Sequence, residues 1–350
     1  MRRVSDKKGQ GHFVKLRSKR GPSRSKEGDP FEASSKSPFW FRPVLQSLHA
    51  ASGQFVAGVL FVALYVLVSA AGDVYAAAYF QRANVWITLL LSFAIVSMMF
   101  NVLAYKEGRR MRVEKSSILA FVSLNCVTAI SWVGLFVGLK YAEPAIVVTF
   151  MVALGPTATA WLNALIRGQG RPPKSDIAAS ALIAAVGSYM VWIAASGNAG
   201  IVWGPRSSLG IFLAIVAGLS LALTGILVKL LFDRGLSGRQ VLAHRFYGAI
   251  LLLLGLSDHS FILQELSQHW LAIVIIALTT IVLPLLLVQE GIRRVEPFTV
   301  NMVLSTAPII TFLFQYFDTR IAPSFYTLAG NVLITAIAVG NLYFQYRRSA

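Results

Sequence analysis

The 350-residue chain has few charged residues, one cysteine and five histidines, and each shortage excludes a class of protein. Asp, Glu, Lys and Arg make up 13% of the sequence, about half the share typical of soluble proteins. The single cysteine, Cys126, excludes an intrachain disulfide and a thiolate metal cluster. We expect it to be a small buried residue inside a hydrophobic segment. No metal-ligand spacing, nucleophile elbow or phosphate-binding loop occurs, so the sequence argues against an enzyme and predicts no metal and no cofactor.

The charged residues are also absent from long hydrophobic runs, and hydrophobic residues make up 56% of the chain. A membrane-spanning helix needs about 20 apolar residues. The fold class predicted is therefore an all-α polytopic membrane protein with ten transmembrane helices. We place the spans at 50–72, 84–105, 117–138, 144–166, 176–196, 207–229, 240–257, 270–290, 297–317 and 321–345. The seventh is the least regular, because its uncharged part begins only at Phe246.

Acidic residues are scarce beside basic ones, 15 against 32, which gives a formal net charge of +17. Much of the excess lies in residues 1–48, which mix Lys and Arg with Ser, Gly and Pro and lack hydrophobic periodicity. We predict a disordered tail attracted to anionic lipid headgroups, and no nucleic-acid partner. Basic loops concentrate on the cytoplasmic side of a membrane. Placing both termini there leaves only four of the 32 basic residues outside, namely Arg82, Lys140, Arg206 and Arg320.

One seven-residue pattern occurs twice. Residues 138–144 (GLKYAEP) end one hydrophobic run and open another, and residues 291–297 (GIRRVEP) do the same in the second half. We interpret this as a duplicated unit, with spans 1–5 in residues 49–196 and spans 6–10 in residues 207–346. Because five spans is an odd number, the second copy is inverted relative to the first. Inverted repeats can open to either side of a membrane in turn, which favours a carrier with alternating access over a channel.

The two G-x-[KR]-x-x-E-P hinges, each followed by a span with an internal proline, resemble the drug/metabolite transporter (DMT) superfamily in its ten-helix EamA-like branch. The resemblance covers about residues 50–346. It implies a basket of helices around a central cavity, with spans 3, 4, 8 and 9 near the axis and spans 5 and 10 at the periphery. It also implies a carrier of small metabolites, often an exporter, in a bacterial inner membrane. The long basic tail departs from the short N-terminus usual in the family.

Polar side chains within the predicted spans are candidate cavity residues, because such groups usually face other helices or water. The candidate substrate-binding residues are Asn125, Thr128, Trp132, Thr149, Thr279, Thr280, Asn301 and Arg245. For the hydroxyls, the alternative is a bond to the carbonyl one turn back. For Arg245, as for Lys229, the alternative is snorkelling to the interface, and Trp132 could be an interfacial residue.

Prolines and Glu-Pro pairs mark the candidate helix hinges. These are Pro156, Pro284, Pro308, Glu143, Pro144, Glu296 and Pro297. A proline inside a span frees a carbonyl about one turn earlier, which can coordinate a ligand or only allow a bend. Each Glu-Pro pair can equally be a tight helix-to-helix connection with no further role.

No acidic residue is expected near the middle of a span. Asp73 and Glu290 lie near span ends, and we expect both to be solvated. Small multidrug-resistance exporters of the same superfamily carry a mid-span Glu in their first span, and residues 50–72 contain no acid. The sequence therefore favours an exporter of amino acids or similar neutral, zwitterionic or anionic solutes. A drug or cationic-compound exporter, a channel and a non-transporting scaffold are the alternatives.

Overall fold

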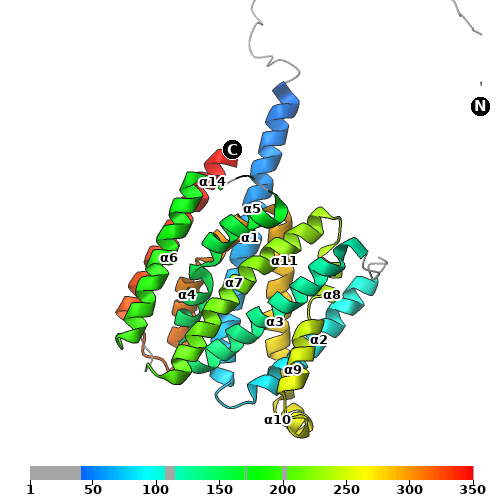
Figure 1. Cartoon of the computed structure of the whole chain (residues 1–350), viewed down its shortest axis with the longest axis vertical. Helices are drawn as coiled ribbons and strands as arrows, with labels where there is room; N and C mark the ends of the chain where they lie inside the picture. Colours follow the sequence, from blue (N-terminus) through cyan, green and yellow to red (C-terminus); the bar gives the residue numbers. More distant parts are fainter. Residues whose placement is uncertain (1–40, 107–114, 169, 171, 199–202, 350) are drawn as a thin grey trace, which may run out of the picture. The chain divides into compact units, whose positions relative to one another are not determined.

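The computed structural model describes residues 41–106, 115–168, 170, 172–198 and 203–349, and all elements in this part of the chain are helical (Figure 1). The predicted disordered tail, residues 1–48, lies outside the described residues up to residue 40, and its last eight residues are the start of a helix, so the prediction of disorder is wrong for them. Residues Leu45–Ala350 form one compact unit. The α-helices are α1 (Phe41–Tyr79), α2 (Val85–Lys106), α3 (Ile118–Tyr141), α4 (Pro144–Ala153), α5 (Gly155–Arg167), α6 (Lys174–Ala195), α7 (Pro205–Asp233), α8 (Gly238–Ala243), α9 (Tyr247–Leu256), α10 (Ile262–Ile275), α11 (Leu283–Arg294), α12 (Pro297–Leu304), α13 (Ala307–Phe314) and α14 (Phe325–Ser349). Shorter elements are η1 (Lys115–Ser117), η2 (His259–Phe261), η3 (Ile276–Val282) and η4 (Gln315–Phe317).

Nine helical segments in the described part of the chain are long and apolar enough to cross a membrane. They correspond to nine of the ten predicted spans, often with shifted ends. The eighth is the longest, from His259 to Arg294, and η3 within it is a π-helix. Pro284 is the second residue after this π-helix, in the first turn of α11. A proline ring inside an α-helix would clash with the carbonyl four residues back, and the wider π turn relieves this clash.

The seventh predicted span, residues 240–257, is not a single helix, and that expectation is wrong. The segment consists of α8 and α9, separated at His244–Phe246. Each piece is too short to cross a membrane by itself, and together they occupy the place of one span. Polar side chains of α2 and α3 bond to the backbone at the break, which is why the chain can leave the helical conformation inside the bundle.

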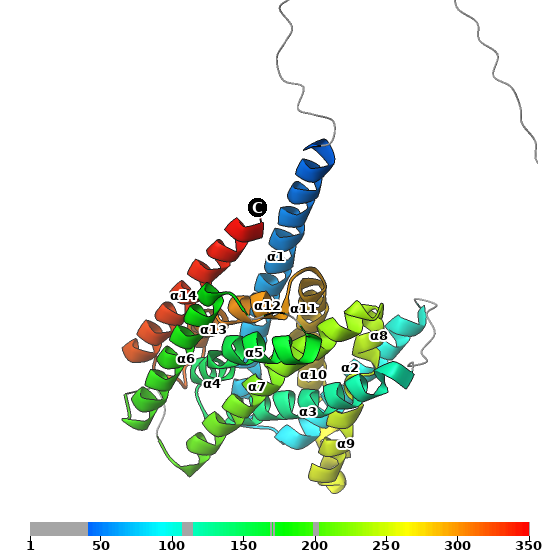
Figure 2. The ribbon, with the colours of Figure 1, turned by 45° about the horizontal axis from the view of Figure 1, so that its top comes forward.

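Burial separates central helices from peripheral ones. Every residue of α4 and of α12 is buried. By contrast, α6 and α14 lie side by side at one edge of the bundle, where Figure 2 shows them together. Helices α4 and α12 are the first halves of predicted spans 4 and 9, and α6 and α14 are predicted spans 5 and 10. Their positions agree with the arrangement that the resemblance implied.

Helices α3 and α7 share the most extensive contact between two helices in the described part of the chain, and glycines leave room for it. A methyl group at Gly134 of α3 would lie 2.8 Å from the carbonyl oxygen of Leu213 in α7. One at Gly138 would lie 3.2 Å from the carbonyl oxygen of Gly210. Small residues four apart are typical of helix pairs in membranes, where close backbone approach replaces the hydrophobic effect as the source of stability.

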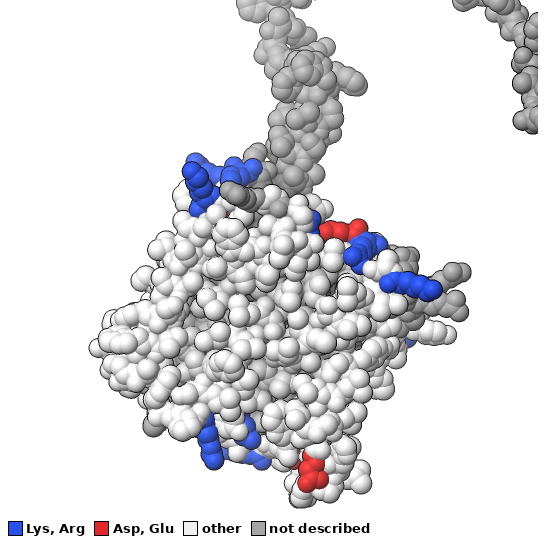
Figure 3. All heavy atoms as spheres, viewed as in Figure 1, with Lys and Arg blue, Asp and Glu red and all other residues white. Residues whose placement is uncertain are grey.

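The surface of the bundle is apolar between two charged margins. Figure 3 shows Lys and Arg gathered at opposite ends of the visible face, with a broad uncharged band between them. Large apolar side chains such as Leu60, Leu64 and Trp161 are exposed on the outside of their helices. Cys126 is also exposed, so the expectation that it is buried is wrong. An apolar outer face is what contact with lipid requires.

Candidate functional site

A narrow crevice of about 30 Å³ lies at the centre of the bundle. Its polar side is a single face of α1, formed by Tyr65, Ser69 and Asp73, whose spacing of four residues aligns them along the helix. Side chains from five other helices complete the lining, and all are apolar: Leu135 of α3, Val148, Met151 and Val152 of α4, Leu221 of α7, Leu304 of α12 and Ala307 of α13. Both halves of the chain therefore contribute to one central site.

Asp73 is the acidic group of this crevice. Its residue is only 5% exposed, so the expectation that it is solvated is wrong. The reason is that α1 continues to Tyr79, seven residues beyond the predicted span end, through an alanine-rich stretch that favours helix. Ser69 Oγ donates to Asp73 Oδ2 at 3.4 Å, and Asp73 Oδ1 is buried with no hydrogen-bond partner. The first span therefore contains a buried carboxylate, and the prediction that it has none is wrong.

Arg245 is a buried basic group that lies in the break between α8 and α9. It is 3% exposed, and its Nε donates to Thr128 Oγ1 at 3.1 Å. Because the side chain is buried among helices, the snorkelling alternative for Arg245 does not hold in this structure.

Asn125 of α3 and Asn101 of α2 form hydrogen bonds to the backbone at the break between α8 and α9. Asn125 Nδ2 donates to the carbonyl of His244 at 2.7 Å, and its Oδ1 accepts from the amide of Gly248 at 2.9 Å. Asn101 Nδ2 donates to the carbonyl of Ala243 at 3.1 Å. Both side chains thus replace the helical bonds that the chain gives up here, and this leaves Arg245 free to point inward.

Replacing Asn125 by alanine is expected to destabilise the protein by about 1–2 kcal/mol, because a partly buried carbonyl and a partly buried amide lose their partner together. The melting temperature of the detergent-purified protein measures this. Thr279→Val is the matched control, since the exposed hydroxyl of Thr279 bonds only to the carbonyl of Ile275 in its own helix. Equal melting temperatures for the two variants would show that Asn125 does not support the break.

The other predicted cavity residues lie around the crevice and do not line it. Trp132 packs in an aromatic cluster between Phe93 and Phe136. Thr149 bonds to Asn331 of α14 at 2.8 Å, facing away from the centre. Two further side chains lie at helix contacts: Thr280 is buried against Gly72 of α1, and Asn301 is buried beside Gly155 of α5. Thr279 is exposed. Contact with substrate stays a prediction for each of these residues.

The three internal prolines lie where helices are interrupted. Pro156 and Pro308 stand in the first turns of α5 and α13, directly after short breaks in spans 4 and 9. Pro284 stands in the first turn of α11, after the π-helix. Pro144 and Pro297 begin α4 and α12, each preceded by a glutamate at the N-cap position. The predicted hinges thus coincide with interruptions, which are the points where a helix can bend at low cost.

The two Glu-Pro hinges lie at opposite ends of spans 4 and 9. Glu143, at the start of span 4, accepts a hydrogen bond from Gln315 at the end of span 9. Glu296, at the start of span 9, pairs with Arg167 at the end of span 4. The two spans are therefore antiparallel neighbours, and each glutamate is joined to the opposite half of the chain. This is the inverted arrangement predicted from the duplication.

Further groups strengthen each end contact. Gln315 Oε1 also accepts from the amide of Ala145 at 3.2 Å, which ties η4 to the first turn of α4. At the other end, Arg167 pairs with Asp233 of α7 at 2.8 Å. Lys229 donates from Nζ to the carbonyls of Ile292, Arg293 and Val295 at 3.1–3.4 Å. Lys229 therefore caps the end of α11 and does not snorkel.

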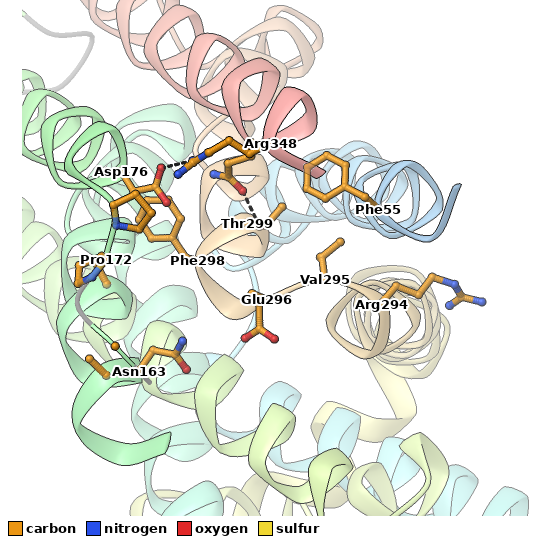
Figure 4. A pocket seen from close by; sticks show the side chains of 15 residues that line it. Phe55, Asn163, Pro172, Asp176, Arg294, Val295, Glu296, Phe298, Thr299 and Arg348 are labelled. Atoms are coloured by element: carbon orange, nitrogen blue, oxygen red, sulfur yellow. Dashed lines mark hydrogen bonds and ion pairs between the residues drawn. The ribbon is translucent and has the colours of Figure 1, made fainter. Parts of the chain in front are cut away.

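Larger cavities open toward both ends of the bundle. A cavity of about 620 Å³ lies beside Glu296, between Phe298 and Thr299 of α12 and the Asp176–Arg348 ion pair (Figure 4). Two cavities of about 610 and 240 Å³ lie at the other end, and Arg320 lines both. Hydrogen bonds from Arg320 lower the pKa of Asp318 there. The small central crevice thus lies between wider openings at the two ends.

Comparison with known proteins supports a transporter. No curated protein matches the chain in sequence. A solved structure described only as "Crystal structure of protein" matches with a TM-score of 0.58 and 17% identity, over 83% of this chain and 97% of that one, which shows a shared fold. Residues 208–343 match the model of the EamA-like transporter family, a family of membrane transporters and not of enzymes. Residues 208–343 of this chain are therefore similar to the EamA-like transporter family of the DMT superfamily, and the apolar, membrane-length helices of the described residues fit a membrane transporter.

Proposed function

We propose that this protein carries a small metabolite, an amino acid or a similar neutral, zwitterionic or anionic solute, across the membrane by alternating access. The observation that supports this most directly is the pair of reciprocal end contacts, Glu143 with Gln315 and Glu296 with Arg167. Each joins one repeat to the other at one end of spans 4 and 9. Breaking one contact while keeping the other would open the central crevice toward a single side.

The interruptions in spans 4 and 9 support the same mechanism. The breaks before Pro156 and Pro308 let each end of a span move without the other end following. A solute could then enter from one end cavity and leave through the other. A channel would instead need both ends open at once.

The distribution of basic residues supports an orientation with both termini in the cytoplasm, and we propose the bacterial inner membrane as the location. In this orientation the Glu296 contact is cytoplasmic and the Glu143 contact is external. Export is the direction that the family resemblance favours. The proposed interaction of the basic tail with anionic headgroups would place residues 1–48 at the inner surface.

Cysteine accessibility tests the alternation. In a Cys126→Ser background, Ala164→Cys reports on the cavity beside Glu296 and Ala78→Cys on the cavity at the other end. Gln315→Leu breaks the Glu143 contact, and Arg167→Gln breaks the Glu296 contact. A hydrogen bond of this kind contributes about 1.4 kcal/mol, so its loss shifts the equilibrium between the inward-open and outward-open conformations about tenfold. We expect Gln315→Leu to raise labelling at position 78 and lower it at position 164, and Arg167→Gln to do the reverse.

Labelling that rises at both positions in either variant would contradict alternating access and support a channel. Solute counterflow in vesicles gives the independent control. A carrier shows saturable exchange of labelled for unlabelled solute, and a scaffold shows none. Measured together, the two assays separate a carrier from both alternatives.

Export of a cationic compound is a second candidate, and Asp73 is the observation that favours it. The argument against this function was the absence of an acid from the first span, and Asp73 lies within that span, in the central crevice. Transport of singly charged cations that carry no carboxylate group of their own would support this alternative.

A further inference from the structure

A further cavity, of about 590 Å³, lies between the end of α7, the start of α8 and the second half of α11. It shares no residue with the central crevice. The apolar runs of α7 and α11 both end beside it, at Asp233 and Arg294. A membrane-spanning helix changes from apolar to charged residues where the hydrocarbon core gives way to lipid headgroups. The cavity therefore lies at the level of the headgroups.

Gln289 of α11 lines this cavity, and its side-chain amide lacks hydrogen bonds. The residue is only 3% exposed, and neither Nε2 nor Oε1 has a partner. A buried amide in this condition is costly, because it has given up its bonds to water without replacing them. The end of a glutamine side chain turns readily about its last bond, so both atoms can reach a ligand in the cavity. Such a ligand must offer an acceptor to Nε2 and a donor to Oε1.

Two arginines line the same cavity from different helices. Arg239 of α8 is exposed, and it makes no hydrogen bond or ion pair with any other residue in the described part of the chain. Arg293 of α11 has a side chain that is 69% exposed, and its contact with Glu290 spans 3.9 Å, which is too long for a hydrogen bond. Glu290 pairs more closely with Arg294. Both guanidinium groups that line the cavity can therefore bind an anion.

We propose that this cavity binds a phosphate group linked to a primary ammonium group, the chemistry of phosphoethanolamine. Arg239, Arg293 and the Nε2 of Gln289 donate to the phosphate oxygens, since guanidinium groups are strong donors to phosphate. The ammonium group donates to the Oε1 of Gln289 and to the carboxylate of Glu290. A phosphate without an amine would leave this Oε1 without a donor. An amine without a phosphate would be repelled by the two arginines.

The same chemistry occurs in two kinds of molecule, a phospholipid headgroup and a soluble phosphomonoester. In either case the ligand would join the start of α8 to the end of α11. The inference goes beyond the proposed function, because the site is separate from the central crevice. Its test measures binding and does not depend on transport.

Two matched sets of ligands test the proposal on the full chain purified in detergent. The soluble set is phosphoethanolamine, phosphocholine and glycerol 3-phosphate. The lipid set is phosphatidylethanolamine, phosphatidylcholine and phosphatidylglycerol with identical acyl chains, added to the micelles in equal amounts. The choline members keep the phosphate and the positive charge but have no N–H donor, and the glycerol members have no ammonium group.

We expect the ethanolamine member of at least one set to raise the melting temperature more than the other two members do. A selective shift in the lipid set alone identifies a headgroup site, and a selective shift in the soluble set identifies a site for a free phosphomonoester. Either result supports the proposal. If neither set favours its ethanolamine member, the proposal is wrong.

Gln289→Leu distinguishes ligand binding from a structural role of the glutamine. Leucine has a similar size and no polar atoms, so the variant without ligand should melt at the same temperature as the unaltered protein or higher. The shift produced by the ethanolamine ligand should be lost. A shift as large as that of the unaltered protein would show that the ligand acts elsewhere, and would overturn the proposal.

Arg239→Gln tests the phosphate contact at an exposed position, where the substitution leaves the packing of the helices intact. We expect affinity for the ethanolamine ligand to fall about tenfold or more, since a hydrogen bond to a charged group is lost. Arg206→Gln makes the same change at the other end of α7, outside the cavity, and should leave the affinity unchanged. Equal affinities of the two variants would contradict the proposal.

Discussion

Lys229→Met is expected to destabilise the protein by about 3 kcal/mol and to weaken the hinge at Glu296. The ammonium group of Lys229 donates to three carbonyls, of Ile292, Arg293 and Val295, at the end of α11. Methionine has a similar length and cannot donate. The last carbonyls of the helix would then lose their partner in a buried place, where water does not readily replace it. The melting temperature of the purified protein gives the size of the effect.

Gln81→Ala is the matched control, because Gln81 also donates to a carbonyl at the end of a helix, beside the other Glu-Pro hinge. Its Nε2 donates to the carbonyl of Lys140, at the end of α3, at 3.0 Å in an exposed position. Water can replace this single bond, so we expect a loss of less than about 1 kcal/mol. Lys229→Met should also raise labelling of Ala164→Cys. Val295, one of the residues that Lys229 holds, directly precedes Glu296, so loss of this bond should weaken the Glu296–Arg167 contact beside the cavity. A Lys229 variant as stable as the Gln81 variant would show that the capping contacts contribute nothing.

Gly218→Ala is expected to have the larger effect on folding. A methyl group at Gly218 of α7 would lie 1.8 Å from the carbonyl oxygen of Met151 in α4, far inside van der Waals contact. Neither atom belongs to a flexible side chain, so the two helices must separate. Overpacking of this kind costs about 1–3 kcal/mol and occasionally more. We expect a value at or above the upper end of this range, with a reduced yield of folded, monodisperse protein.

Gly225→Ala tests the same substitution in the same helix without the clash. No atom lies within 4 Å of the added methyl group at Gly225. Alanine also favours a helix over glycine, so this variant should be as stable as the unaltered protein or more so. Melting temperatures and size-exclusion profiles of the two variants provide the comparison. If Gly218→Ala were equally tolerated, the close approach of α7 to α4 would be incorrect.

Much of the architecture follows from the sequence, because the bilayer makes charge and hydrophobic length decisive. Uncharged stretches such as 84–105 and 207–228 correspond closely to α2 and α7. The duplicated Glu-Pro hinges predicted the inverted arrangement, which the reciprocal contacts of Glu143 and Glu296 confirm. Proline positions likewise predicted the interruptions in spans 4 and 9.

The candidate site was less accessible to prediction. None of the eight predicted cavity residues lines the central crevice, and two of them, Arg245 and Thr128, bond to each other beside it. Asp73 was missed because the predicted span stopped at Gly72, although the alanine-rich stretch up to Tyr79 favours continuation of the helix. Glycine alone does not end a helix when the residues after it favour one. That signal was present in the sequence.

The sequence by itself determined that this chain is helical, that its segments cross a membrane and that its two halves are inverted copies. These properties depend on local hydrophobic length, charge and repeated spacing. Only the tertiary structure decided that Asp73 is buried, that span 7 breaks at Arg245 and that Tyr65, Ser69 and Asp73 line one crevice. The physical reason is that burial of a side chain, and the partners it lacks, depend on which helices pack around it. That packing is set by contacts between residues far apart in the chain.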